Sequence, residues 1–208
     1  MQSKKVDTVF EYMTKLFGAA PKCELVYKSD IDLLVAVMLS AQCTDRRVNA
    51  VTAKLFEKYK TVQDYANADE TEFRREVYST GFYRTKANNI IKMAKTVVSE
   101  HGGKIPADMD KLTRMAGVGR KTASVFLAEF HKIPAIAVDT HVIRISNRLG
   151  FTENKSPAAI ERDLKAIFDS SNWAKYHLYM VLFGRYHCRA QNPDCSACKL
   201  HHCCVHYD

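Results

Sequence analysis

A glycine-rich turn followed by two basic residues is the first feature of the sequence that could support chemistry. Gly117 and Gly119 flank Val118, and glycines permit a sharp turn with positive φ and close approach of another backbone. A helix starting at Arg120 would offer its first N–H groups and positive dipole end to an anion, beside the charges of Arg120 and Lys121. The pattern favours a helix-hairpin-helix that grips a DNA phosphate without reading sequence. The alternative is an ordinary corner between two helices.

A single carboxylate, Asp139, is the second candidate, in the segment Val138-Asp139-Thr140-His141. An amphipathic run to Leu149 follows it, so Asp139 can be read simply as a helix N-cap. A carboxylate at a helix start is also kept ionised by the dipole and the backbone N–H groups. Such a group could stabilise positive charge on a sugar or accept a proton from a nucleophile. The two interpretations are compatible.

Four cysteines near the end of the chain have the spacing of metal ligands. They are Cys188, Cys195, Cys198 and Cys204, separated by six, two and five residues. Four thiolates from one short segment can surround a single metal centre, either zinc or an iron–sulfur cluster. Histidines nearby keep zinc possible: His187, His201, His202 and His206. Cys203 does not fit the spacing and is interpreted as a bystander.

Composition restricts the class of protein and its compartment. The 208 residues carry 31 Lys and Arg against 23 Asp and Glu, a formal charge of +8 that suits a polyanionic partner such as nucleic acid. No stretch is apolar enough to cross a membrane, and residues 1–10 contain no secretory signal. Seven cysteines without such a signal argue against a disulfide framework. We therefore expect a cytoplasmic protein with no membrane partner.

The elements that must position these residues are helices. Capping residues, glycine stops and apolar periodicity predict helices after Ser29, at 73–78, at 85–100, from Asp108 to Gly117, at 120–130, after Asp139, after Ser156-Pro157 and at 173–186. The apolar run 33–39 is expected to be a buried helix. Residues 133–138 form the only strand-like run, which is too short and isolated to found a sheet. The sequence therefore predicts an all-α protein.

Four segments taken together resemble endonuclease III, a helix-hairpin-helix DNA glycosylase and abasic-site lyase. They are Leu-Ser-Ala-Gln-Cys-Thr-Asp at 39–45, Ala-Gly-Val-Gly-Arg-Lys-Thr-Ala-Ser at 116–124, Ala-Val-Asp-Thr-His-Val-Ile-Arg-Ile-Ser-Asn-Arg-Leu-Gly at 137–150, and the terminal cysteine motif. Their order and spacing match, and the likeness covers essentially the whole chain.

That resemblance implies two helical lobes. A six-helix lobe with the hairpin would span residues 23–133, and residues 1–22 and 134–208 would form a second lobe with a [4Fe–4S] cluster. Lys121 would be the attacking lysine and Asp139 the catalytic aspartate. The four cysteines named above would be the cluster ligands. DNA with a damaged base or abasic site would lie across the cleft between the lobes, bound by a monomeric, nucleoid-associated bacterial enzyme.

The resemblance also implies DNA-contacting residues beyond the hairpin positions Gly117, Gly119 and Arg120. Gln42 matches the residue that fills the gap left by a flipped base, and Phe82 occupies the position of the wedge. His141 is similar to a residue near the DNA backbone. One segment departs from the family: residues 189–194 hold one basic and one acidic residue, where relatives are richer in Lys and Arg.

Three other classes of protein compete with this interpretation. A non-catalytic helix-hairpin-helix module would explain the charge and the hairpin but leaves the pair of Lys121 and Asp139 without a role. A zinc-stabilised regulatory protein would explain the cysteines alone. Related adenine glycosylases share the cluster and the aspartate, but they lack the lysine and carry an extra C-terminal domain. The lysine here, and a chain that ends four residues after Cys204, favour the bifunctional enzyme.

Overall fold

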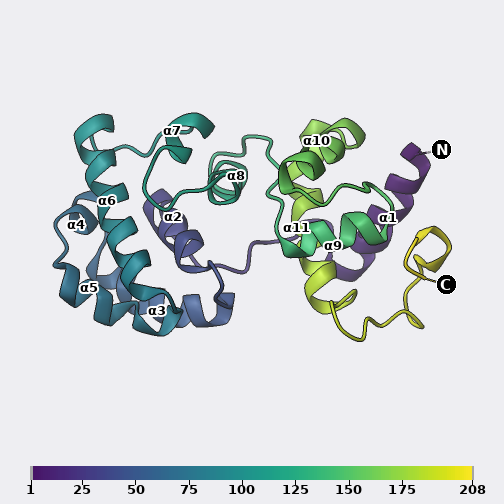
Figure 1. The fold of residues 1–208 in the computed structure, drawn as a ribbon, viewed down its shortest axis with the longest axis horizontal. Coiled ribbons are helices and arrows are strands. Elements are labelled where there is room, and N and C mark those ends of the chain that lie inside the picture. The colour runs from purple at the N-terminus through teal and green to yellow at the C-terminus, as the bar shows by residue number, and fades with distance from the viewer. Residues whose placement is uncertain (1, 208) are drawn as a thin grey trace. The chain divides into compact units, whose positions relative to one another are not determined.

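A computed structural model describes residues 2–207, which form helices and connecting turns without a β-strand in that range. The all-α prediction is therefore confirmed. The chain divides into two compact units: one is the continuous segment 23–131, and the other joins the residues before Cys23 to those after His131 (Figure 1). The expected boundary at residue 133 thus lies two residues beyond the observed one.

The continuous unit holds the helices from α2 to α8. Their bounds are α2 Asp30–Leu39, α3 Asp45–Lys58, α4 Val62–Ala66, α5 Glu70–Glu76, the 3₁₀ turn η1 Tyr78–Thr80, α6 Tyr83–His101, α7 Met109–Thr113 and α8 Arg120–Glu129. Helix α6 packs against α4, α5 and α2, and α2 packs in turn against α8. Leu33, Phe73, Ile90 and Phe126 lie wholly buried in one core.

Local signals explain where these helices begin and end. Ser29 caps α2 in a capping box with Asp32, as the sequence predicts, and all residues from Leu33 to Leu39 are buried. Helix α6 ends at Gly102, which is left-handed with a φ of 58° and donates its N–H to the Val97 carbonyl. Helix α7 is shorter than predicted. It ends at Thr113 rather than Gly117, because residues 115–118 form tight i→i−3 turns.

The second unit combines the first helix with the last third of the chain. Its helices are α1 Gln2–Phe17, α9 Thr140–Arg148, α10 Pro157–Ile167, η2 Ser170–Asn172, α11 Trp173–Tyr186 and η3 His201–Cys203. Figure 1 shows the purple α1 among the green and yellow helices of this unit. The Phe10 ring stacks on the ring of Tyr176 with centroids 3.7 Å apart, and Tyr179 donates its hydroxyl to the Gly18 carbonyl at 2.7 Å.

No helix within residues 2–207 combines the length and the apolar character that crossing a membrane would require.

Candidate active site and thiol site

The hairpin turn between α7 and α8 requires glycine at one of its two glycine positions. Gly117 has a φ of 74°, and a Cβ there would lie 2.7 Å from the Asn89 Cβ and 3.0 Å from the Met38 Cε. Both neighbours belong to packed helices, α6 and α2. Met115 and Val118 on either side are buried. The turn is therefore held in place by the core, and a side chain at residue 117 would be both strained and crowded.

Gly119 does not need the conformational freedom that the sequence suggested for both glycines. Its φ is −84°, and nothing lies within 4 Å of the position a Cβ would take. Gly119 is the N-cap residue of α8, and no side chain caps that helix start. The lack of a side chain leaves open space in front of the first-turn N–H groups. A phosphate could occupy that space, at the positive end of the helix dipole.

The two basic residues of the motif lie in the first turn of α8. Arg120 and Lys121 are exposed, whereas Ala123 and Phe126 on the same helix are wholly buried. The amine of Lys121 therefore lies on the solvent side of a helix that the core fixes from behind. An amine placed this way is accessible to a large substrate and lies on a rigid element.

Two exposed residues of the same unit have unusual backbone conformations. Gln42, after α2, has a φ of 53°, and Phe82, before α6, has a φ of 47°. Such values are uncommon for residues other than glycine, and for a bulky residue they are outliers. The Phe82 side chain is 66% exposed. The Phe82 ring is therefore not part of the hydrophobic core of its unit.

Asp139 is the N-cap of α9, as the sequence predicts. Its Oδ1 accepts a hydrogen bond from the Val142 N–H at 2.8 Å, and the residue is half-buried. The helix start therefore holds the carboxylate in a defined orientation while solvent still reaches it. These are the requirements for a group that stabilises charge or accepts a proton.

His141, two residues further on, packs against α11 rather than projecting into solvent. The His141 Nδ1 lies 3.2 Å from Nη2 of Arg144. A Cβ added to Gly184 would lie 3.0 Å from the His141 Cβ. Burial lowers the pKa of His141, with Arg144 and Arg185 acting in the same direction against the charge of Asp139. His141 is therefore less readily protonated than a surface histidine.

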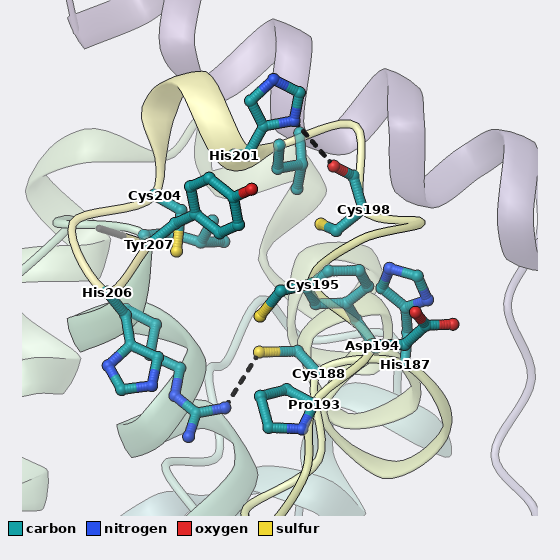
Figure 2. Close-up of a pocket in the computed structure, with 14 residues that line it drawn as sticks. His187, Cys188, Pro193, Asp194, Cys195, Cys198, His201, Cys204, His206 and Tyr207 are labelled. Atoms are coloured by element: carbon teal, nitrogen blue, oxygen red, sulfur yellow. Dashed lines mark hydrogen bonds between the residues drawn. The ribbon is translucent and has the colours of Figure 1, made fainter.

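The four predicted cysteine ligands line one pocket whose surface is almost entirely apolar (Figure 2). They are Cys188, Cys195, Cys198 and Cys204. Burial raises the pKa of the Cys198 thiol, and the other three sulfurs raise it further. Four thiolates in such a pocket repel one another and are stable there only beside a cationic centre.

Cys203 lies outside that pocket although it directly precedes Cys204. Its thiol donates to the Leu200 carbonyl at 3.3 Å, and the side chain packs against the core of the unit. The interpretation of Cys203 as a bystander agrees with this position.

The sequence interpretation missed two arginines that join α9 to the cysteine segment. Arg148 Nη1 donates to Cys188 Sγ at 3.2 Å and to the Arg189 carbonyl at 2.8 Å. Arg144 Nη2 donates to the Gly184 carbonyl at 2.6 Å, and its Nε donates to the Cys188 carbonyl at 3.3 Å. Their spacing of four residues, which places both on one face of a helix, was the signal available in the sequence.

Zinc and an iron–sulfur cluster make different demands on these side chains. Within residues 2–207, no three side chains of His, Cys, Asp or Glu converge closely enough to bind a single ion. A zinc ion needs its ligands about 2.0–2.3 Å from one point. A four-iron cluster takes its thiolates on different irons and so spaces them more widely. The four cysteine thiols are the donors that a four-iron cluster takes, whereas zinc also accepts imidazole nitrogens, and His187, His201 and His206 line the same pocket.

Comparison with known proteins defines the class. The family model of the HhH-GPD superfamily base excision DNA repair protein matches residues 35–170, a range that contains the hairpin, Lys121 and Asp139. The chain belongs to this superfamily.

Individual relatives narrow the class further. The chain is 43% identical over 198 residues to endonuclease III of Bacillus subtilis, covering 95% of this chain and 90% of that protein. It is 40% identical to endonuclease III of Rickettsia felis, covering 100% and 97%. A solved structure described as a trapped endonuclease III–DNA covalent intermediate superposes with a TM-score of 0.93 at 44% identity, covering 98% of this chain and 95% of that one.

Proposed function

We propose that this protein is a bifunctional DNA N-glycosylase and abasic-site lyase, which removes oxidised pyrimidines from duplex DNA and nicks the strand. The observation that carries the proposal is Lys121, an exposed amine in the first turn of the hairpin helix α8. Endonuclease III relatives match this chain over nearly its whole length. DNA-bound endonuclease III structures share its fold.

Binding to DNA would use charge and backbone together. The formal charge of +8 favours association with a polyanion. The uncapped start of α8, with Gly119 leaving it open and Arg120 beside it, would hold one phosphate of the damaged strand. These contacts position the strand without reading its sequence. The enzyme would therefore act in the cytoplasm at the nucleoid, where its substrate lies.

Base removal requires the damaged nucleotide to leave the helix, at a cost of a few kcal/mol that is smallest for damaged bases. Phe82, exposed after η1, would enter the base stack, and Gln42 would offer its amide to the orphaned partner base. Both side chains are exposed on the continuous unit. His141 would lie near the DNA backbone.

The chemistry would begin with a covalent bond between enzyme and sugar. The neutral amine of Lys121 attacks C1′, the bond from C1′ to the base nitrogen breaks, and the base leaves as an anion. Asp139 stabilises positive charge on the sugar, accepts one proton from the attacking amine and passes it to the departing base. The second amine proton moves to O4′ as the sugar ring opens, which gives an imine between C1′ and the Lys121 nitrogen.

Strand cleavage would follow from the acidity that this imine gives to C2′. A proton leaves C2′, the bond from C3′ to its phosphate oxygen breaks, and the strand is nicked by β-elimination. Water then hydrolyses the imine, which leaves an unsaturated aldehyde at the 3′ end of the upstream fragment and restores the Lys121 amine; the phosphate that departed from C3′ is the 5′ end of the downstream fragment. No metal ion is needed in these steps.

The four cysteines would hold a [4Fe–4S] cluster. The meeting of four cysteines in one pocket supports this assignment, and the Arg148 guanidinium donates to Cys188 Sγ. When bound, the cluster would supply a covalent cross-link for residues 188–204. Those residues also support α9, the helix that Asp139 caps, because Arg148 donates to the Arg189 carbonyl and Arg144 donates to the Cys188 carbonyl.

Borohydride trapping on abasic-site DNA tests the central claim. Wild-type protein should give a covalent complex and a nicked strand, because borohydride reduces the imine. The variant Lys121→Gln should give neither while keeping DNA affinity within several-fold. Lys111→Gln, which removes an exposed lysine from α7, is the matched control and should trap like wild type. Trapping by Lys121→Gln would mean that another amine is the nucleophile.

A further inference from the structure

Two turns of the continuous unit carry the side chains that we assign to base opening. Gln42 follows the end of α2, and Phe82 follows the end of η1. Both have positive φ, a conformation that persists only when the surrounding structure enforces it. The two turns are about 40 residues apart in the sequence. Contacts with the rest of the unit must therefore hold each turn in its conformation and fix the position of one turn relative to the other.

A buried lysine contacts the chain just before both turns. Lys86, in the first turns of α6, is only 7% exposed. Its Nζ donates to the Leu39 carbonyl at 2.8 Å and to the Thr80 carbonyl at 2.7 Å. Leu39 is the last residue of α2, and Thr80 is the last residue of η1. One ammonium group thus joins the ends of the two elements.

The chemistry of these contacts explains why lysine suits the position. Carbonyls in the last turn of a helix lack partners within the helix and lie at its negative end. An ammonium group has several N–H donors and a full positive charge, so it can satisfy two such carbonyls at once. Burial lowers the pKa of Lys86, and the hydrogen bonds to the two carbonyls offset part of the cost of taking the ammonium group out of water.

The same helix also supports the hairpin. Asn89, one turn after Lys86, packs against Gly117, whose added Cβ would lie 2.7 Å from the Asn89 Cβ. Helix α6 therefore contacts the Gln42 turn, the Phe82 loop and the phosphate-binding turn from one side. The Lys86 ammonium joins the first two to each other through hydrogen bonds to the last residues of α2 and η1.

We infer that Lys86 is a positioning residue that fixes the Gln42 turn and the Phe82 loop relative to each other, and thereby controls base opening rather than the chemical step. The inference rests on the proposed function. A duplex with a paired lesion needs both turns in place, because the base must be extruded and the gap filled. A duplex with a pre-formed abasic site has no base to extrude, and so depends less on them.

The experiment compares two single-turnover rates for each variant: excision of a paired oxidised pyrimidine, and nicking of an abasic site in the same duplex. Lys86→Met removes the donors and keeps a long apolar side chain. It should lower excision at least tenfold while nicking stays within about threefold of wild type. Lys86→Arg, which keeps charge and donors, should recover most of the excision rate.

Controls separate positioning from folding and from charge. Lys95→Met removes an exposed lysine about 2.5 turns along α6, on the opposite side of the helix, and should leave both rates unchanged. Borohydride trapping on abasic DNA counts the active molecules in each preparation. If Lys86→Met does not fold, Lys86→Gln, which keeps two N–H donors on a shorter side chain, should still lower excision more than nicking.

A double variant supplies a second, independent test. In a Phe82→Ala background, Lys86→Met should change the ratio of the two rates by no more than about threefold, because both changes act on the same loop. Equal loss of both rates, or a ratio like that of wild type, would overturn the inference and leave Lys86 a purely structural residue. Failure of wild-type protein to nick abasic DNA would instead refute the proposed function.

Discussion

Asp139 has a structural contact that would by itself explain its place at the start of α9. Its carboxylate accepts the Val142 N–H at 2.8 Å, the ordinary bond of an N-cap. Asparagine caps helices about as well as aspartate, whereas it cannot stabilise a cationic sugar or take up a proton in the same way. The two roles of this residue can therefore be separated by one substitution.

We expect Asp139→Asn to lower the free energy of unfolding by ~1 kcal/mol or less. Base excision should fall by orders of magnitude, because the charge is lost at the reacting centre. Urea denaturation and single-turnover excision rates measure the two effects. A fully active Asp139→Asn protein would reduce this residue to a helix cap.

Removing the Phe82 side chain should have little effect on the melting temperature and a large effect on the rate of base excision. Because its side chain is 66% exposed, Phe82→Ala should leave the melting temperature near that of wild type. A lost stacking contact worth ~1–3 kcal/mol predicts that excision of a paired lesion falls about 5- to 150-fold, with a smaller loss on abasic sites. Phe73→Ala, at a wholly buried position, is the contrasting control. It should cost ~3–5 kcal/mol of stability. A strongly destabilised Phe82→Ala with an unchanged substrate ratio would contradict the wedge role.

Site residues were predictable where a local motif fixes their surroundings. Lys121 on an exposed helix start and Asp139 at an N-cap follow from glycines, charges and periodicity within a few residues. Lys86 and Arg148 were not predictable this way, because their partners are distant in the sequence. Lys86 donates to the Leu39 carbonyl, 47 residues away, and Arg148 donates to Cys188 Sγ, 40 residues away. In the sequence they are ordinary basic residues of amphipathic helices.

At the scale of the element, the two glycines of the hairpin differ although they look alike in the sequence. We expect Gly117→Ala to destabilise the protein by about 2 kcal/mol or more, because positive φ is unfavourable for alanine and its Cβ meets Asn89.

Gly119→Ser should keep or slightly raise stability, since serine is a good N-cap. It should nevertheless weaken DNA binding, because its side chain fills the open space before α8.

Urea unfolding and fluorescence anisotropy with an abasic-site analogue duplex, at one fixed salt concentration, measure these two effects. Wild-type DNA affinity in Gly119→Ser would show that the start of α8 does not hold a phosphate. A stable Gly117→Ala would show that the turn can relax away from α6.

Helix boundaries were predictable where caps and stops agree, as for α2, α6, α10 and α11. Helix boundaries were less predictable where burial of side chains in the core determines the end of a helix. Residues 115–118 continue the apolar pattern of α7, yet they turn away from the helix because Met115 and Val118 both insert into the core. The strand-like run 133–138 forms no strand. It is connecting chain, in which Ala135, Ile136 and Ala137 are buried.

At the scale of the whole molecule, the cysteine pocket lies in the unit that combines residues before Cys23 with residues after His131. We expect the purified protein to be yellow-brown, with about four iron atoms per chain and little zinc. Cys204→Ser should lose iron, colour and solubility. Cys203→Ser, outside the pocket, should keep all three. Iron analysis and visible absorbance decide the matter, and the reverse pattern would make Cys203 the fourth ligand.

The division into two units could be predicted only in part from local patterns. Periodicity identifies helices, whereas it does not say which distant helices share a core. The resemblance to endonuclease III supplied the pairing of the first helix with the last third of the chain. The physical basis of that pairing is the burial of Val9, Phe10 and Met13 against α11 and its neighbours, which is visible only in three dimensions.

This pairing of the chain ends has a consequence for synthesis on the ribosome. The unit of residues 23–131 is contiguous, so it can fold as soon as its last helix has emerged. Helix α1 is made before that unit, but its partner α11 emerges only after more than 150 further residues. During that interval Val9, Phe10 and Met13 remain without the core that buries them in the finished protein. Until α11 emerges, the nascent chain therefore exposes the apolar face of α1, and the second unit is complete only when the cysteine segment that follows α11 has also been made.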